Sequence, residues 1–281
     1  MSVFPAYGLG WRPDLPDPRD FTPAHEALSA ALGRLGRLKS LPKRVDWRPY
    51  GPPIEDRCPR GGGAACACVA LLRYFERRAT GKNPRLSRAF LQWTARRLLA
   101  QVGGGEEELR TTWKAAVRFG IPREEDWPSA GNDPKQEPDA FAYASAIKFP
   151  GLAYVRLDDR RRPGEAVLRT VKSFLAAGFA SVFGFCVCTG LSAEADIPGP
   201  TVFDAVWGGQ AAIAVGYDDV RKIRSWRGAL LIGSSWGNQW GDGGYGWLPY
   251  AYVLDRLALD FWTLVRPEWL ASGEFERPFT P

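Results

Sequence analysis

Apolar residues recur at helical spacing in the first half of the chain and in shorter runs in the second half. Between residues 66 and 79 they follow one helix face, and no proline interrupts them. Similar spacing predicts helices over 87–99 and 106–119, with Ser87 as the N-cap of the first and Gly120 ending the second. The first half is therefore predicted to be helical.

The pattern changes after about residue 150. Short apolar or alternating runs bounded by turn residues predict strands at 154–157, 181–188, 211–217, 229–233 and 261–265. One helical run, 167–176, lies among them, and the tail beyond Pro267 is expected to be peripheral. Helices followed by strands favour an α+β fold.

Three regions follow from these patterns. Residues 1–40 are rich in proline and glycine and turn helical near 27–37, which predicts an N-terminal extension or pro-segment-like strap. Residues 41–135 are predicted to form an α-rich lobe and residues 136–281 a β-rich lobe, with a cleft between them.

Composition excludes several classes of function. The 281 residues are 45% hydrophobic, enough for a sizeable core, and carry a formal net charge of +6. The excess arginines are scattered without interleaved aromatic residues, so no nucleic acid is expected as a partner. The N-terminus lacks the pattern of a signal peptide and no segment is apolar enough to insert in a membrane, which favours a cytoplasmic location.

The five cysteines lie in two segments. An odd number without a signal peptide favours a reducing compartment, so all five are expected to be free thiols. Buried cysteines often only fill a core, but a thiolate metal site or redox pair stays open as an alternative. The candidates are Cys58, Cys66, Cys68, Cys186 and Cys188.

Cys66 has the surroundings of a nucleophile. It follows a glycine run at 61–63 and lies where the first predicted helix begins. Unpaired backbone N–H groups and the helix dipole favour a thiolate at such a position.

Four segments resemble papain-family (C1) cysteine peptidases. Residues 41–48 resemble the start of the mature enzymes, and 86–91 resemble the helix start after the nucleophile helix. Residues 208–217 resemble the strand that carries the family's histidine, and 234–245 resemble the block N-S-W-G-x-x-W-G-x-x-G-Y. The resemblance implies a papain-like fold, with an α-helical lobe and a β-barrel-like lobe, in a bacterial-type member.

The resemblance fails at the residues that carry the chemistry. With Cys66 as the equivalent of the nucleophile, the family's histidine falls on Gln210, 144 residues later (210 − 66), within the roughly 130–150 typical of such pairs. Its asparagine falls on Ser234, and its oxyanion-hole glutamine on Arg57. A glutamine amide cannot shuttle a proton near neutral pH. The chain's one histidine, His25, lies in the predicted extension.

These departures predict a pseudo-peptidase that keeps a peptide-shaped cleft without turnover and needs no cofactor. Its expected partner is a polypeptide, either another protein or its own N-terminal segment, and six residues are expected to contact it: Gly103, Gly104, Gly105, Phe185, Ala211 and Trp236. Two alternatives stay open, an unorthodox cysteine peptidase or transferase that uses Cys66 and a thiolate metal or redox protein.

Overall fold

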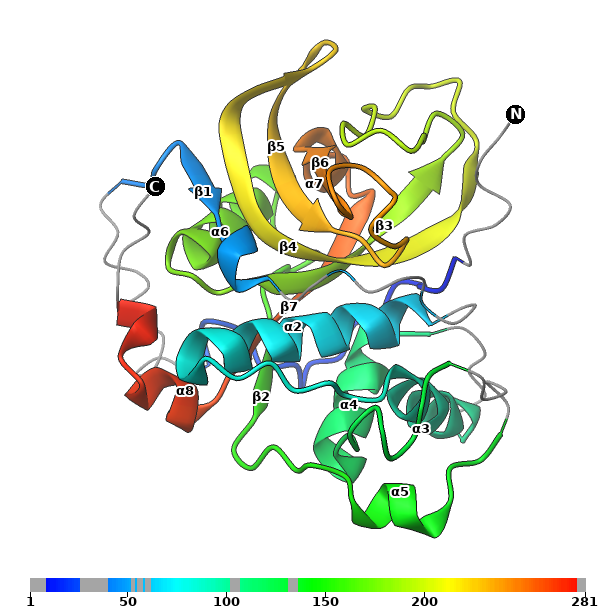
Figure 1. Ribbon diagram of the computed structural model, residues 1–281. Coiled ribbons are helices and arrows are strands. Elements are labelled where there is room, and N and C mark those ends of the chain that lie inside the picture. Colours follow the sequence, from blue (N-terminus) through cyan, green and yellow to red (C-terminus); the bar gives the residue numbers. More distant parts are fainter. Residues whose placement is uncertain are drawn as a thin grey trace.

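The computed structural model describes residues 9–25, 40–51, 54, 58, 62–101, 107–130 and 136–276. Its centre is helix α2 (Gly63–Thr80), which runs between a twisted sheet on one side and a group of helices on the other (Figure 1). Thirteen of the 18 residues of α2 are buried, because both sides of the helix are covered.

The strands of the described residues form one antiparallel sheet. Its order is β2-β7-β3-β4-β5-β6, with β1 (Arg44–Asp46) added alongside β4. The longest strand, β4 (Val206–Ile223), pairs with β3 (Ser181–Cys188) on one side and β5 (Trp226–Gly233) on the other. The remaining strands are β2 (Ala153–Arg156), β6 (Tyr245–Pro249) and β7 (Ala258–Val265).

Helices α3 (Arg88–Ala100) and α4 (Leu109–Phe119) pack on each other and on the face of α2 opposite the sheet, with α5 (Ala140–Ala144) beyond them (Figure 1). Ser87 caps α3 as expected, since its hydroxyl accepts the N–H of Phe90 at 3.1 Å. Gly120 ends α4 with a φ of 74°, a conformation that favours glycine. Helices followed by an antiparallel sheet confirm the α+β class.

Two further helices cover the other side of the sheet. Helix α6 (Gly164–Ala176) packs on β4 and on the short helix α7 (Ala251–Leu254). A 3₁₀ turn, η3 (Arg48–Tyr50), follows β1 and contacts α2.

The C-terminal tail is part of the core, so its predicted peripheral position is wrong. Helix α8 (Pro267–Ala271) and the 3₁₀ turn η4 (Glu274–Glu276) lie against α2. Trp269 is 2% exposed and its ring stacks on Phe75 of α2 at 4.9 Å, and Phe275 stacks on the same ring at 5.4 Å. Aromatic side chains this large stabilise a fold wherever they can be buried.

The N-terminal residues 9–25, which we call the strap, cross the molecule beside α2 (Figure 1). Near its end, the carbonyl of Phe21 accepts the N–H of Arg156 in β2 at 2.7 Å. The predicted helix near residues 27–37 lies outside the described residues.

Candidate functional site

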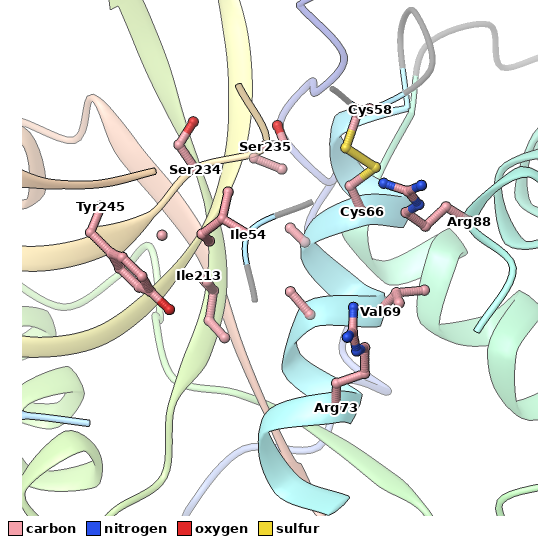
Figure 2. A pocket seen from close by; sticks show the side chains of 14 residues that line it. Ile54, Cys58, Cys66, Val69, Arg73, Arg88, Ile213, Ser234, Ser235 and Tyr245 are labelled. Carbon is pink, nitrogen blue, oxygen red and sulfur yellow. A yellow bond between two sulfur atoms is a disulfide. The ribbon is translucent and has the colours of Figure 1, made fainter. Parts of the chain in front are cut away.

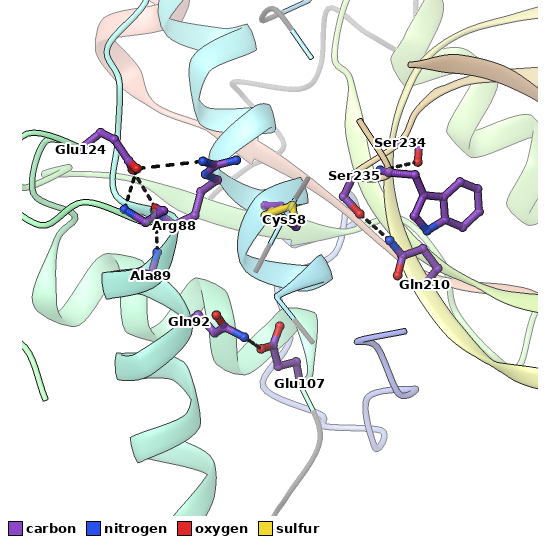
Figure 3. The surroundings of a disulfide bond; sticks show 12 residues. Cys58, Arg88, Ala89, Gln92, Glu107, Glu124, Gln210, Ser234 and Ser235 are labelled. Atoms are coloured by element: carbon purple, nitrogen blue, oxygen red, sulfur yellow. Dashed lines mark hydrogen bonds and ion pairs between the residues drawn. A yellow bond between two sulfur atoms is a disulfide. The ribbon is translucent and has the colours of Figure 1, made fainter. Parts of the chain in front are cut away.

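Gln210 lies in β4, paired across the ladder with Phe185 of β3. Its side chain is 1% exposed and points toward the start of α2, while its Nε2 donates a hydrogen bond to Ser235 Oγ (Figure 3). The Oε1 atom is buried as well and has no hydrogen-bond partner among the described residues. Gln210 is thus held in one orientation by a serine.

Ser234 has a different partner. Its hydroxyl accepts the backbone N–H of Trp236 at 2.9 Å, a turn that fixes the segment following β5 (Figure 3). The ring of Trp236 packs edge-on against Trp240 at 4.8 Å and against Phe185 at 6.1 Å. The hydroxyl that contacts Gln210 is therefore that of Ser235, a residue that the sequence did not single out.

On α2, the residue that lies against Gln210 is Gly63. A methyl group on Gly63 would lie 3.1 Å from Gln210 Oε1. The helix begins at Gly63, three residues before the predicted start, and the N–H of Cys66 already donates to the carbonyl of Gly62 at 2.9 Å. Cys66 is thus one turn further along the helix than the residue that faces Gln210.

Cys66 is bonded to Cys58, so the prediction of five free thiols is wrong for this pair. The disulfide joins the segment ahead of α2 to the first turn of the helix, with 6.3 Å between the two Cα atoms. The other three cysteines are free thiols. The prediction failed because the number of cysteines in a sequence does not show which two the fold brings together.

A small cavity of about 50 Å³ lies between α2 and the sheet (Figure 2). Both bonded cysteines line it, together with Ser234 and Ser235. The rest of its wall is mostly apolar, with two arginines and one tyrosine: Ile54, Ala67, Val69, Ala70, Arg73, Arg88, Ala211, Ile213, Gly233 and Tyr245.

A buried carboxyl group lies at the start of α2. Glu107 is 3% exposed, and its Oε1 accepts from Gln92 Nε2 at 2.8 Å (Figure 3). The same oxygen pairs with Arg96 at 3.2 Å. Burial raises its pKa to about 7, against the opposing effects of Arg96, Gln92 and the backbone N–H groups of Ala64 and Ala65. At neutral pH Glu107 is therefore only in part a carboxylate, and its Oε2 atom has no hydrogen-bond partner among the described residues.

The strap bridges β4 and the segment that precedes α4. The N–H groups of Gly10 and Trp11 donate to the carbonyl of Gly209 at 3.1 and 3.2 Å, and that of Arg12 donates to the carbonyl of Glu107 at 3.0 Å. The Arg12 guanidinium then pairs with Glu108 at 2.7 Å. Extended backbone thus bonds the sheet on one side and the helical part on the other.

Trp11 is 5% exposed and packs against two glycines of adjacent strands. A methyl group at Gly184 would lie 1.9 Å from its ring, and one at Gly209 would lie 2.3 Å from its carbonyl oxygen. Any larger residue at either position would displace the strap.

The six residues predicted to contact a polypeptide fall into two groups. Phe185, Ala211 and Trp236 are all buried, at 1%, 0% and 4% exposure, and Ala211 lines the cavity. Gly103, Gly104 and Gly105 lie outside the described residues, as does Arg57, the predicted equivalent of the oxyanion-hole glutamine. No polypeptide contact was predicted for Arg57. Contact of the six residues with a polypeptide stays a prediction.

His25 packs edge-on against Phe21 at 4.8 Å, next to β2. Three strand spacings, through β7 and β3, separate β2 from β4 and Gln210. At about 4.8 Å each they amount to roughly 14 Å, too far for a hydrogen bond.

The remaining thiols and the metal alternative can be assessed in the described part of the chain. Cys68 is fully buried in α2, and Cys186 and Cys188 lie on β3. No three histidine, cysteine, aspartate or glutamate side chains of the described residues converge to hold a metal ion. Within the same residues, none of the helices is both long and apolar enough to span a membrane.

Comparisons with solved structures identify the fold. Xylellain, a cysteine protease from Xylella fastidiosa, is similar with a TM-score of 0.72 and 28% identity over 92% of this chain and 96% of that one. Procathepsin B from Trypanosoma congolense is similar with a TM-score of 0.66 and 16% identity, over 92% and 86%. Bromelain from Ananas comosus gives 0.58 and 14%, over 80% of this chain and all of that one (100%).

A sequence relative agrees. An uncharacterized peptidase C1-like protein, L477, of Acanthamoeba polyphaga mimivirus is 29% identical over 186 residues. The match covers 63% of this chain and 58% of that relative, so the chain spans less than two thirds of it. No protein-family model matches the chain. The chain has the papain-like fold of the C1 cysteine proteases, as the sequence motifs predicted.

Proposed function

We propose that this protein is a non-catalytic papain-like protein that holds an extended polypeptide, its own strap. The strap occupies a groove, by which we mean the space between β4 and the segment that precedes α4. Gln210 is the observation that carries the first half of the proposal. Cysteine proteolysis needs a thiolate and a base within hydrogen-bond reach of each other. The residue against Gln210 is a glycine, and the nearest cysteine of α2 is in a disulfide.

The chemistry of the glutamine amide also supports a non-catalytic protein, because an amide cannot act as a general base or acid. It neither accepts a proton from a thiol nor delivers one to a leaving amine near neutral pH. Its Nε2 is already engaged with Ser235. Loss of the base removes transition-state stabilisation, whereas the binding of a peptide in its ground state needs only the groove.

The strap supports the second half. Its backbone donates to Gly209 on one wall and to Glu107 on the other, and Trp11 fills the space above two glycines. Main-chain hydrogen bonds combined with one buried aromatic anchor are how extended peptides are recognised in general. A polypeptide from a partner protein would have to displace these contacts.

Turnover is tested with a broad peptide library at several pH values, comparing the protein with its Cys66→Ala variant. We expect no cleavage by either. Cleavage that disappears in Cys66→Ala would contradict the proposal and favour an unorthodox peptidase or transferase that uses Cys66.

Occupancy of the groove is tested by hydrogen exchange on the full chain. The amides of residues 10–12 should be protected, and Trp11→Ala should remove that protection. Leu15→Ala is the matched control on the same strap, since Leu15 is 74% exposed and should leave protection unchanged. Free exchange of these amides in the unmodified protein would exclude the strap as the occupant and leave a partner protein.

A further inference from the structure

The buried side chains of the strap are three residues apart where it leaves the groove. Trp11 is 5% exposed and Asp14 is 0% exposed, whereas Leu15 is 74% exposed. Pro13, between the two buried residues, is exposed as well. Side chains at this spacing share one face of a polyproline II chain, whose backbone has no internal hydrogen bonds and is free to bond to a neighbour. The rest of the protein therefore contacts one face of an extended segment.

Asp14 is bound through both its side chain and its backbone. Its carboxylate accepts the N–H of Arg110, near the start of α4, at 3.3 Å and the indole N–H of Trp262 at 3.0 Å. Its own N–H donates to Asp260 at 2.7 Å, and its carbonyl accepts from Arg160 at 2.6 Å. A helix start and an indole N–H bind a charged carboxylate more strongly than a neutral amide. This position therefore favours an acidic side chain.

The charges around Asp14 also favour an acidic segment. The strap supplies two carboxylates here, Asp14 and Asp20, and Asp20 pairs with Arg110 at 2.7 Å. Without the strap, three arginines and two aspartates would remain, a formal charge of +1 (3 − 2): Arg110, Arg156, Arg160, Asp158 and Asp260. An unpaired guanidinium is costly to bury, so a segment that replaces the strap must bring carboxylates of its own.

The groove carries the opposite charge at the position of Arg12. The Nε and Nη2 atoms of Arg12 donate to Glu108 Oε1 at 3.1 and 2.7 Å. Thr111 Oγ1 donates to the other carboxylate oxygen at 3.0 Å, which fixes the orientation of Glu108. The side chain of Arg12 is 37% exposed, so this ion pair contributes less to binding than the buried Asp14. Glu108 and the arginines together determine the direction in which a segment can lie.

We propose that the groove recognises extended, proline-containing segments of other proteins with the pattern Trp-Arg-x-Asp, and that the strap is a resident ligand which such segments displace. This inference rests on the proposed function, since the strap must occupy the groove. The aromatic ring lies over Gly184 and Gly209, the cation pairs with Glu108, and the carboxylate binds the start of α4. All these contacts are non-covalent, so a second chain with the same spacing can make each of them.

A labelled synthetic peptide of residues 9–21 tests this recognition on the full-length protein. Trp11→Ala removes the anchor of the resident strap, which otherwise competes from within the same molecule. The peptide should therefore bind Trp11→Ala at least about tenfold more tightly than the unmodified protein. Fluorescence anisotropy measures the affinity, and circular dichroism checks that the variant is folded.

Changes within the peptide test the pattern without altering the protein. Asp14→Asn in the peptide should weaken binding about tenfold, because the amide loses charged hydrogen bonds. Exchanging the order of Pro13 and Asp14 moves the carboxylate by one position and should weaken binding as much. Leu15→Ala is the matched control and should bind like the original peptide, since Leu15 is 74% exposed.

A charge reversal tests the assignment of Glu108. In the Trp11→Ala background, Glu108→Lys should bind the Arg12→Glu peptide more tightly than the original peptide, the reverse of the preference before the substitution. Glu125→Lys should retain the original preference, since Glu125 is 71% exposed and pairs with Arg123.

Four results would overturn the proposal. The peptide could fail to bind Trp11→Ala, or bind it no better than the unmodified protein. The original and reordered peptides could bind equally. A concentration-dependent dimer of the unmodified protein that Trp11→Ala abolishes would make the strap of a second copy the ligand.

The proposed function is tested separately, by the exchange of the amides of residues 10–12. Protected amides together with an unselective peptide would make the strap a fixed part of the fold, and only the recognition of other proteins would be excluded.

Discussion

The segments that precede α2 are tied to the core in two different ways. The strap is held without any covalent bond, by backbone hydrogen bonds, a buried tryptophan and a cluster of buried charges. Cys58 is held by its disulfide to Cys66 and by one backbone hydrogen bond, in which its N–H donates to the carbonyl of Ser235 at 3.4 Å. A connection made of many mutually dependent contacts responds to anything that disturbs the core, whereas a single disulfide responds mainly to redox conditions.

The cluster of buried charges makes the attachment of the strap sensitive to changes in the core. The N–H of Asp14 donates to Asp260 at 2.7 Å, and its carboxylate accepts from the Trp262 indole at 3.0 Å. Asp158 accepts the N–H groups of Asp260 and Phe261, each at 2.9 Å. Seven charged groups of the strap, α4, β7 and the segment from β2 onward face one another here: Asp14, Asp20, Arg110, Arg156, Asp158, Arg160 and Asp260.

The largest expected effect comes from removing a cation at the centre of this cluster. Arg156→Met leaves buried carboxylates without their partner, because Arg156 contacts Asp260 at 2.5 Å and Asp20 at 3.4 Å. We expect a loss of about 3–5 kcal/mol in the free energy of unfolding, measured by denaturant titration. Arg161→Met is the control, since that side chain is 90% exposed. Equal stability of the two variants would mean that the cluster does not hold the strap.

Removing the covalent connection should cost less. Cys58→Ala combined with Cys66→Ala frees a loop of nine residues, for which loop-closure entropy predicts about 2–3 kcal/mol. Denaturant titration measures the loss. In hydrogen exchange, residues 10–12 should keep their protection, since the strap does not depend on the disulfide. Loss of that protection would show that the two connections are coupled.

A further effect on stability is expected from pH. Burial raises the pKa of Asp14 to about 6 and that of Asp260 to about 8, from ordinary values of 3.8. The folded protein therefore binds more protons than the unfolded chain, and stability that is present below pH 4 is lost as pH rises through 6 and 8.

Denaturant titrations at pH 5 and pH 8.5 measure this difference. Asp260→Asn should reduce it, while the reduced disulfide should leave it unchanged. A stability that increases from pH 5 to pH 8.5 would refute the raised pKa values of Asp14 and Asp260.

The smallest expected effect is on catalysis. Gln210→His should produce no measurable peptide cleavage, whether the disulfide is intact, reduced or removed, because the residue that faces position 210 is Gly63. The library assay described above measures turnover. Cleavage that appears on reduction would show that the disulfide conceals a working thiol.

Much of the fold follows from local patterns. The strand 181–188 was predicted at its observed bounds, and the helices α3 and α4 ended where Gly120 and the apolar spacing indicated. Helix α2 begins three residues before the predicted start, and the sequence did not indicate this because glycine is a poor helix former in isolation. The buried carboxyl group of Glu107 near this end comes from 44 residues away (107 − 63).

The candidate site was predicted only in part. The strand motif located Gln210, but the pairing with Ser235 and the approach of Gly63 depend on the packing of α2 against β4. The contacts of Trp11 with Gly184 and Gly209 likewise join residues far apart in the sequence, and the disulfide depends on how the segment ahead of α2 folds back on the helix. The proline- and glycine-rich composition of residues 1–40 predicted the strap, but nothing in the sequence showed that Trp11 is its buried anchor.

The C-terminal tail has a consequence for the order in which the molecule can assemble. Arg78 of α2 is 4% exposed, and its guanidinium donates to the carbonyls of Gly178 at 2.6 Å and Glu274 at 3.1 Å while it covers the rings of Trp47 and Phe275. Helix α2 is thus synthesised early, but some of its partners lie about 200 residues further along the chain. Until residues 267–276 leave the ribosome, the part of α2 around Phe75 lacks the rings of Trp269 and Phe275 that cover it and is exposed to aggregation. A nascent chain that stops short of residue 269 should therefore bind chaperones for as long as it persists.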